Sequence, residues 1–159
     1  MVTTVSLREV IPDDIAVFFV QEQDPATRAV SGFAGKRPTE RQAYDALWAG
    51  LLTDETVKVK TVLLGDDVIG YVAAFERLVG QREVAYWIGR EFWGRNLATQ
   101  ALTLFLEQFT ERPLYARCAI DHRASMRVLE KCGFVTYGRG RFFAEARGTE
   151  VDEWIFELK

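Results

Sequence analysis

Several features that mark whole classes of protein are scarce in this sequence. Only two of the 159 residues are cysteine, Cys118 and Cys132, and only one, His122, is histidine. Two cysteines at no motif spacing do not build a disulfide scaffold, so we expect free, reduced thiols. No group of histidine, cysteine and acidic residues has metal-ligand spacing, so we expect no metal.

A large excess of charge of one sign and long apolar runs are also missing. The net charge is −3, and this total gives no sign of the basic excess typical of nucleic-acid binders. No apolar run approaches the ~20 residues that span a bilayer. The start, MVTTVSLREV, alternates like a strand and lacks the apolar core of a signal peptide. We therefore expect a cytoplasmic protein with no nucleic-acid or membrane partner, folded as one domain over 1–159.

Hydrophobic periodicity predicts a mixed α/β sheet. Alternation with period two marks strands, and spacing of three and four residues marks helices. Thr39 and Gln42 resemble a capping box that would start the second helix. Residues 24–37 predict a short helix or a loop. Strands are expected at 2–8, 57–64, 68–76, 83–89, 114–120, 134–143 and 150–158, and helices at 12–23, after Thr39, at 96–109 and at 125–132. This order gives one parallel crossover near the middle of the sheet.

The stretch FWGRNLAT (92–99) lies between a predicted strand and a predicted helix. A helix N-terminus offers free N–H groups and a positive dipole end, which suit a phosphate. Gly89 and Gly94 let the backbone approach a ligand, and Arg90 and Arg95 add positive charge. On its own, this stretch is better explained as an ordinary strand-to-helix turn.

A second segment, DHRASMRVLEKCGF (121–134), follows the next strand and ends in a helix stop at Gly133. Together with WGRNLA (93–98), it resembles the GNAT superfamily of acetyl-CoA-dependent N-acetyltransferases, closest to the RimJ/RimL-type subgroup that acetylates ribosomal-protein N-termini. The positions that match the first motif are Tyr86, Trp87, Trp93, Gly94, Arg95, Ala98, Thr99, Ala101 and Leu102. Those that match the second are Ser125, Arg127, Val128, Leu129, Glu130, Lys131, Gly133 and Phe134.

The resemblance implies a GNAT fold, a mixed central sheet of about seven strands with helices on both faces and splayed central strands. It also implies acetyl-CoA as cosubstrate, with the pantetheine arm in the splay and the pyrophosphate over the loop. The coenzyme-binding residues expected on this basis are Trp87, Ile88, Gly89, Arg90, Gly94, Arg95, Asn96, Leu97, Ala98, Thr99, His122 and Ser125.

Three positions depart from the family pattern. Asn96 stands where the loop has its central glycine, and asparagine is the residue that best tolerates left-handed backbone after glycine. His122 replaces an asparagine that contacts the pantetheine arm. Leu129 stands where many members carry a tyrosine acid, so that mechanism is excluded at this site.

Transfer of an acetyl group to an amine by direct attack requires a proton to leave the nitrogen and another to reach the departing sulfur. Glu83 is the leading candidate for the base, because some family members carry a catalytic glutamate at this position of the strand. A solvated glutamate at a strand start is the alternative. Ser125 is the leading candidate to protonate or hydrogen-bond the coenzyme sulfur, and support of its helix is the alternative.

The acceptor is expected to be a primary amine, either a protein N-terminus or a small molecule. In this fold the first helices and the last hairpin wall its groove, which points to Phe33, Phe142 and Glu145 as substrate contacts. Ordinary packing or a solvated loop would explain each of them. A homodimer is compatible with the resemblance.

Two other functions stay open at this stage. The departures at Asn96, His122 and Leu129 also suit a catalytically weak acyl-CoA-binding sensor or partner module. A thiol hydrolase that uses Cys118 and His122 is a fainter alternative, because Cys118 lies in an apolar strand that is typical of a core.

Overall fold

One mixed sheet of seven strands organises the chain. The computed structural model describes residues 4–31, 38–144 and 147–159. The strand order is β1-β2-β3-β4-β5-β7-β6, and all neighbours are antiparallel except β4 and β5. The strands are β1 Val5–Glu9, β2 Lys58–Leu64, β3 Asp67–Leu78, β4 Gln81–Ile88, β5 Leu114–Ala119, β6 Val135–Ala144 and β7 Thr149–Leu158. The predicted α/β class and the parallel crossover are confirmed.

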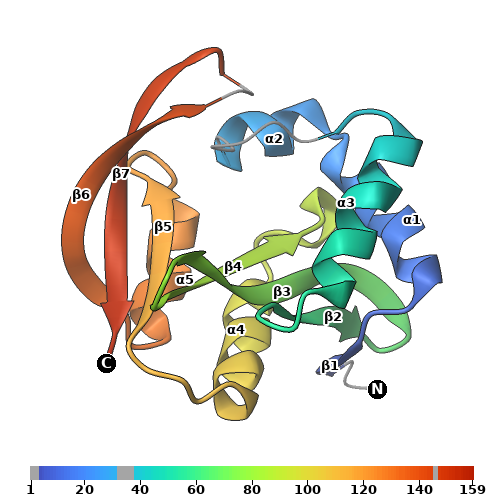
Figure 1. Cartoon of the computed structure of the whole chain (residues 1–159), viewed down its shortest axis with the longest axis horizontal. Coiled ribbons are helices and arrows are strands. Elements are labelled where there is room, and N and C mark those ends of the chain that lie inside the picture. The colour runs from blue at the N-terminus through green and yellow to red at the C-terminus, as the bar shows by residue number, and fades with distance from the viewer. Residues whose placement is uncertain (1–3, 32–37, 145–146) are drawn as a thin grey trace.

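Helices cover both faces of this sheet, as predicted. They are α1 Pro12–Glu22, α2 Pro25–Ser31, α3 Arg41–Thr53, α4 Leu97–Gln108 and α5 Arg123–Lys131, with a short 3-10 turn, η1, at Arg90–Phe92. The side chains of Tyr71 and Trp87 pack in a cluster with aromatic residues of α1 and α3. Val72 lies in the other cluster, which includes α4 and α5 residues. Figure 1 shows α1–α3 gathered beside β2–β4, with the curved β6–β7 ribbon at the opposite edge.

Two local predictions need correction. The helix α3 begins at Arg41 after an extended Glu40, so Thr39 is not its N-cap, and no side chain caps that end. The residues of α4, LATQALTLFLEQ, are apolar almost all round, which predicts deep burial on every side, but only one face is buried, through Leu97, Ala101, Leu102 and Phe105. The i, i+4 and i+8 spacing of those residues makes α4 an ordinary amphipathic helix.

The parallel pair at the centre of the sheet is very short. The strands β4 and β5 pair only at Arg82 with Leu114 and at Glu83 with Tyr115. Beyond Glu83, β4 continues to Ile88 and pairs only with β3. The predicted splay of the central strands is confirmed, and it opens immediately after Glu83.

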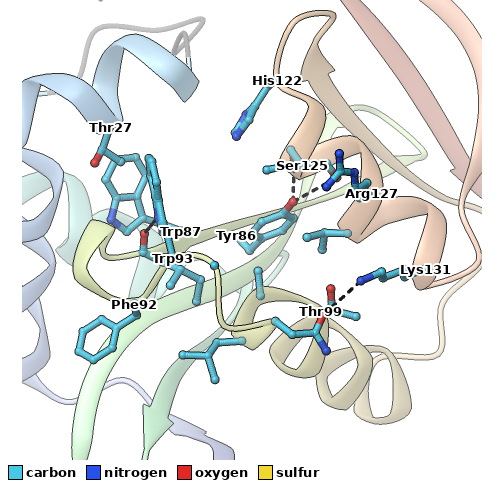
Figure 2. A pocket seen from close by; sticks show the side chains of 17 residues that line it. Thr27, Tyr86, Trp87, Phe92, Trp93, Thr99, His122, Ser125, Arg127 and Lys131 are labelled. Atoms are coloured by element: carbon cyan, nitrogen blue, oxygen red, sulfur yellow. Dashed lines mark hydrogen bonds between the residues drawn. The ribbon is translucent and has the colours of Figure 1, made fainter.

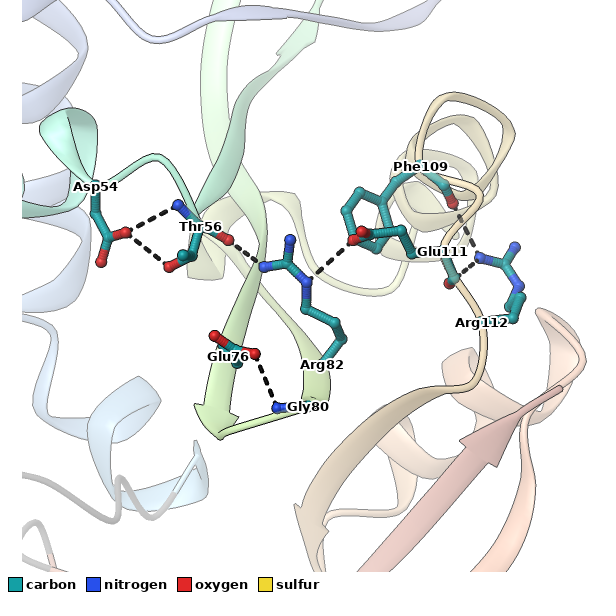
Figure 3. Close-up of polar contacts among 8 residues, drawn as sticks. All are labelled: Asp54, Thr56, Glu76, Gly80, Arg82, Phe109, Glu111 and Arg112. Carbon is teal, nitrogen blue, oxygen red and sulfur yellow. Dashed lines mark hydrogen bonds and ion pairs between the residues drawn. The ribbon is translucent and has the colours of Figure 1, made fainter.

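Arg82 secures the closed end of this pair (Figure 3). Its guanidinium donates to the backbone carbonyl of Thr56, before β2, and forms an ion pair of 3.0 Å with Glu111, before β5. It also lies 5.7 Å from the centre of the Phe109 ring. Arg112 donates to two carbonyl oxygens of the same connection, at 3.0 and 2.8 Å. These contacts hold the start of β4 against the segment that leads into β5.

We expect Gly70→Ala to lower the free energy of unfolding by at least about 3 kcal/mol, because overpacking next to rigid backbone has no easy relief. A Cβ on Gly70 would lie 1.8 Å from the carbonyl oxygen of Trp87. Urea unfolding measures the loss. Gly50→Ala is the matched control: Gly50 lies exposed inside α3 with nothing within 4 Å of its Cβ position. This control should gain about 0.5–1 kcal/mol, and equal effects of both changes would contradict the prediction.

Candidate active site

A pocket of about 600 Å³ occupies the opening between β4 and the elements that follow β5. Figure 2 shows its residues pointing inward from β4, from the loop before α4 and from α5. It is lined by Thr27, Tyr86, Trp87, Ile88, Phe92, Trp93, Gly94, Asn96, Leu97, Ala98, Thr99, His122, Ala124, Ser125, Arg127, Val128 and Lys131. The two sequence motifs therefore meet at one cavity.

The loop before α4 forms one end of the pocket. Asn96 has φ 61° and ψ 19°, in the left-handed region, and Gly94 has φ 75°. The first hydrogen bond of the helix runs from the N–H of Gln100 to the carbonyl of Asn96 at 3.3 Å. The three N–H groups of 97–99 precede that bond, so they have no partner within the helix. This arrangement suits an anion, and the left-handed backbone explains why asparagine can replace glycine there.

Two cations of α5 face the same end of the pocket. Arg127 and Lys131 are four residues apart, on the face of α5 that also carries Ala124 and Val128. The ammonium of Lys131 lies 3.5 Å from the side-chain oxygen of Asn96, so it bridges α5 and the loop. Both residues belong to the second sequence motif, but they were not among the expected coenzyme contacts. The signal that could have found them is their own four-residue spacing, which places both on one face of a helix.

Tyr86 and Ser125 meet in the middle of the pocket, across the splay (Figure 2). Their hydroxyl oxygens are 2.7 Å apart, with either able to donate. Burial raises the pKa of Tyr86, although the hydrogen bond to Ser125 opposes this. Tyr86 therefore stays protonated at neutral pH and can donate its proton in a hydrogen bond while Ser125 directs its own toward the cavity.

His122 lies at the other end, before α5. Burial lowers the pKa of its imidazole, against the opposing effect of Asp121, so a neutral ring is favoured at pH 7. Asp121 accepts two hydrogen bonds from Arg147, at 2.9 and 3.2 Å. These bonds tie the end of the β6–β7 hairpin to the start of α5. The neutral imidazole can offer one donor and one acceptor to a ligand in the pocket.

The wall opposite α5 comes from β4 and α2. The indole N–H of Trp93 donates to the carbonyl of Ile88 at 2.8 Å, which fixes η1 against the end of β4. Thr27 donates to Asp24 at 2.9 Å, and the Asp24 carboxylate lies 3.4 Å from Arg90. The turn between α1 and α2 is therefore linked to the loop that follows β4.

The structure gathers some predicted residues and separates others. Trp87, Ile88, Gly94, Asn96, Leu97, Ala98, Thr99, His122 and Ser125 all line the pocket. Gly89, Arg90 and Arg95 are not among the lining residues, and Arg90 pairs with Asp24 instead. Their contact with coenzyme stays a prediction. Thr27, Phe92 and Ala124 are lining residues that carried no signal in the sequence.

The predicted base, Glu83, and the predicted substrate contact Phe142 are not among the described residues that line this pocket. Glu83 is 4% exposed and forms an ion pair of 3.0 Å with Arg117. Phe142 is half-buried on β6, whereas Phe33 and Glu145 fall outside the described residues. Their roles stay predictions.

Cys118 has no feature of a nucleophile. It is buried in β5, and burial raises the pKa of its thiol to about 12. The thiolate is the reactive form, so a thiol hydrolase that uses Cys118 is disfavoured. In the described part of the chain, no three His, Cys, Asp or Glu residues are placed to hold a metal ion. A metal-free site stays a prediction.

A family model described as the acetyltransferase (GNAT) domain matches residues 4–135. The chain belongs to this family. A relative, the uncharacterized N-acetyltransferase p20 of Bacillus licheniformis, is 27% identical over 99 residues, which are 58% of this chain and 56% of that protein. The match therefore spans little more than half of the relative's length.

Solved structures agree on the fold. Mycobacterium smegmatis RimJ, in complex with CoA-disulfide, superposes with a TM-score of 0.83 at 19% identity, covering 99% of this chain and 82% of that one. The spermidine N-acetyltransferase from Vibrio cholerae, in complex with CoA and spermine, gives 0.79 at 19% identity, covering 96% and 95%. The family model confirms the predicted GNAT family, and the solved structures share its fold. The RimJ/RimL-type subgroup stays a prediction.

The left-handed backbone of Asn96 predicts how substitutions there affect stability. Asn96→Ala should lower the free energy of unfolding by about 1–2 kcal/mol, the cost of left-handed backbone for an ordinary residue. Asn96→Gly should cost little and leave coenzyme affinity equal or better. Urea unfolding and calorimetric titration with coenzyme A measure the two effects. A large loss of affinity in the glycine variant would show that the asparagine side chain itself holds the ligand.

Proposed function

We propose that this chain is an acetyl-CoA-dependent N-acetyltransferase that acts on a primary amine. One observation carries the proposal: the N–H groups at the start of α4, which have no partner within the helix, open into the same pocket as the splayed end of β4. The pocket has a site that suits an anion at one end and both apolar and polar side chains along its walls. This shape suits a long ligand that has a phosphate group at one end and a narrow arm at the other.

The residues of the pocket fit acetyl-CoA. The N–H groups of 97–99, with Arg127 and Lys131 beside them, would hold the pyrophosphate. Tyr86, Trp87 and Ile88 would line the pantetheine arm, and His122 and Ser125 would offer it polar contacts. When bound, the coenzyme supplies an activated acetyl group as a thioester.

The reaction is direct transfer without a covalent enzyme intermediate. A bond forms between the amine nitrogen and the acetyl carbon, and the bond between that carbon and sulfur breaks. One proton leaves the nitrogen, with Glu83 as the proposed acceptor, and one reaches the sulfur. Ser125 is positioned to supply that proton or a hydrogen bond, because its hydroxyl lines the pocket and contacts Tyr86 at 2.7 Å.

The acceptor is proposed to be a protein N-terminus or a small-molecule amine. Both kinds are compatible with the related structures, since one of them is a spermidine N-acetyltransferase and another is RimJ. None of the helices in residues 4–31, 38–144 and 147–159 is long and apolar enough to cross a membrane. The expected cytoplasmic location and homodimer stay predictions.

The deciding experiment incubates the protein with acetyl-CoA and a panel of amines, namely spermidine, free amino acids and short peptides with different N-termini. Thiol release and the mass of the amine product are followed together. We expect amine-stimulated thiol release with a mass gain that corresponds to one acetyl group. Thermal stabilisation by acetyl-CoA with no amine-stimulated release would support the sensor function instead, and no stabilisation would contradict both.

Ser125→Ala should lower kcat by about a hundredfold, the lower end of the range for loss of a proton-transfer group. Coenzyme affinity should change much less, because the anion end of the pocket is untouched. Steady-state kinetics with acetyl-CoA and the best amine measure both. Arg123→Ala, which removes an exposed side chain from the first turn of the same helix, is the control. An unchanged kcat in Ser125→Ala would limit the serine to a structural role.

A further inference from the structure

A buried charge cluster bridges the central strands where they separate. We define the splay cluster as Glu83 on β4, Arg117 on β5 and Glu153 on β7. Arg117 donates from Nε to Oε2 of Glu83 at 3.0 Å and from Nη1 to Oε1 of Glu153 at 2.7 Å. Glu83 is the last residue of β4 paired with β5, and Arg117 lies two residues beyond its partner, Tyr115. One guanidinium therefore spans the base of the splay.

Both carboxylates are withdrawn from water. Glu83 is 4% exposed and Glu153 is 5% exposed, and they share Arg117, whose side chain is 23% exposed. The remaining described charge near Glu83 is Arg77 on β3, 40% exposed and 3.6 Å from Oε1. On the far side, β6 makes room with Gly140, because a Cβ there would lie 3.1 Å from Oε1 of Glu153.

The cluster faces the uncovered part of β4. Side chains alternate along a strand, so Glu83, Ala85 and Trp87 share one face. Trp87 is buried and lines the pocket, yet Ala85 between the two is exposed although it lies in a central strand. An acceptor that approaches the acetyl group on this face would pass over Ala85, with the Glu83 carboxylate on one side and the Trp87 indole on the other.

We infer that Arg117 and Glu153 are positioning residues for Glu83, the proton acceptor of the proposed function on which this inference rests. Arg117 fixes the direction of the Glu83 carboxylate through Oε2, and Glu153 fixes Arg117. Because both carboxylates contact one guanidinium, a change at Glu153 alters the contact that Arg117 makes with Glu83. Glu83 receives the proton that leaves the amine nitrogen and then releases it to water.

Opposite shifts of the pH–rate profile test this inference. Arg117→Gln removes the cation and leaves two carboxylates facing each other, so the acid limb of kcat should move to higher pH by about one unit. Glu153→Gln removes a neighbouring negative charge and leaves Arg117 to Glu83 alone, so the limb should move to lower pH. Glu83→Gln should abolish the limb. Asp152→Asn, one residue along β7 in an exposed pair with Arg139 and Arg141, should leave it unchanged.

Two further readouts separate positioning from general stability. Thermal stabilisation by coenzyme A should be the same in all variants, because the cluster lies outside the pocket lining. Arg117→Lys keeps the charge but loses the forked contact, so kcat should fall while the acid limb stays in place. This variant also serves if Arg117→Gln does not fold.

The outcomes distinguish the two proposals. Absence of acetyl transfer by the wild-type protein would contradict the proposed function itself. An active wild type whose acid limb is unmoved, or moves in the same direction, in Arg117→Gln and Glu153→Gln would overturn the inference and leave acetyl transfer intact.

Discussion

The early separation of β4 from β5 is the constraint on which the site depends. A parallel ladder normally satisfies the backbone N–H and C=O groups of both strands, but here it ends at Glu83 and Tyr115. From there to Ile88, the edge of β4 that turns toward α5 must find other partners. A ligand that carries amide groups can pair with this edge as a strand would. The opening therefore creates the pocket, and the proposed coenzyme carries amide groups of this kind.

Beyond the end of the ladder, side chains connect β4 to the elements on the other side of the opening. Arg117 joins Glu83 at the base of the opening, and Tyr86 joins Ser125 farther along. At the end of β4, the Trp93 indole occupies the carbonyl of Ile88. The first two contacts connect β4 to β5 and to α5 across the opening without filling the space between them. The separation is therefore set by hydrogen bonds of definite length, as a preorganised site requires.

Much of this arrangement could be predicted from the sequence, because it depends on local pattern. The left-handed backbone at Asn96 and the stop at Gly133 follow from residue chemistry, and both are observed. The role of Thr39 was predicted wrongly, because capping depends on which residue is extended, and that residue is Glu40. The pairing of Arg117 with Glu83 and Glu153 could not be predicted. It joins residues 34 and 36 positions apart, and only the strand order brings them together.

The splay cluster consists of charged residues, and this bears on its role. A buried ion pair is weak support for stability, because desolvation of both charges offsets most of their attraction. Apolar side chains of similar volume would close the base of the opening at least as well. Two carboxylates on one arginine make energetic sense where a carboxylate must be held in one direction and remain able to exchange a proton. The exposure of Ala85 beside them places that carboxylate at the open face of β4. Position and chemistry together favour a role for the cluster in proton transfer over a role in folding.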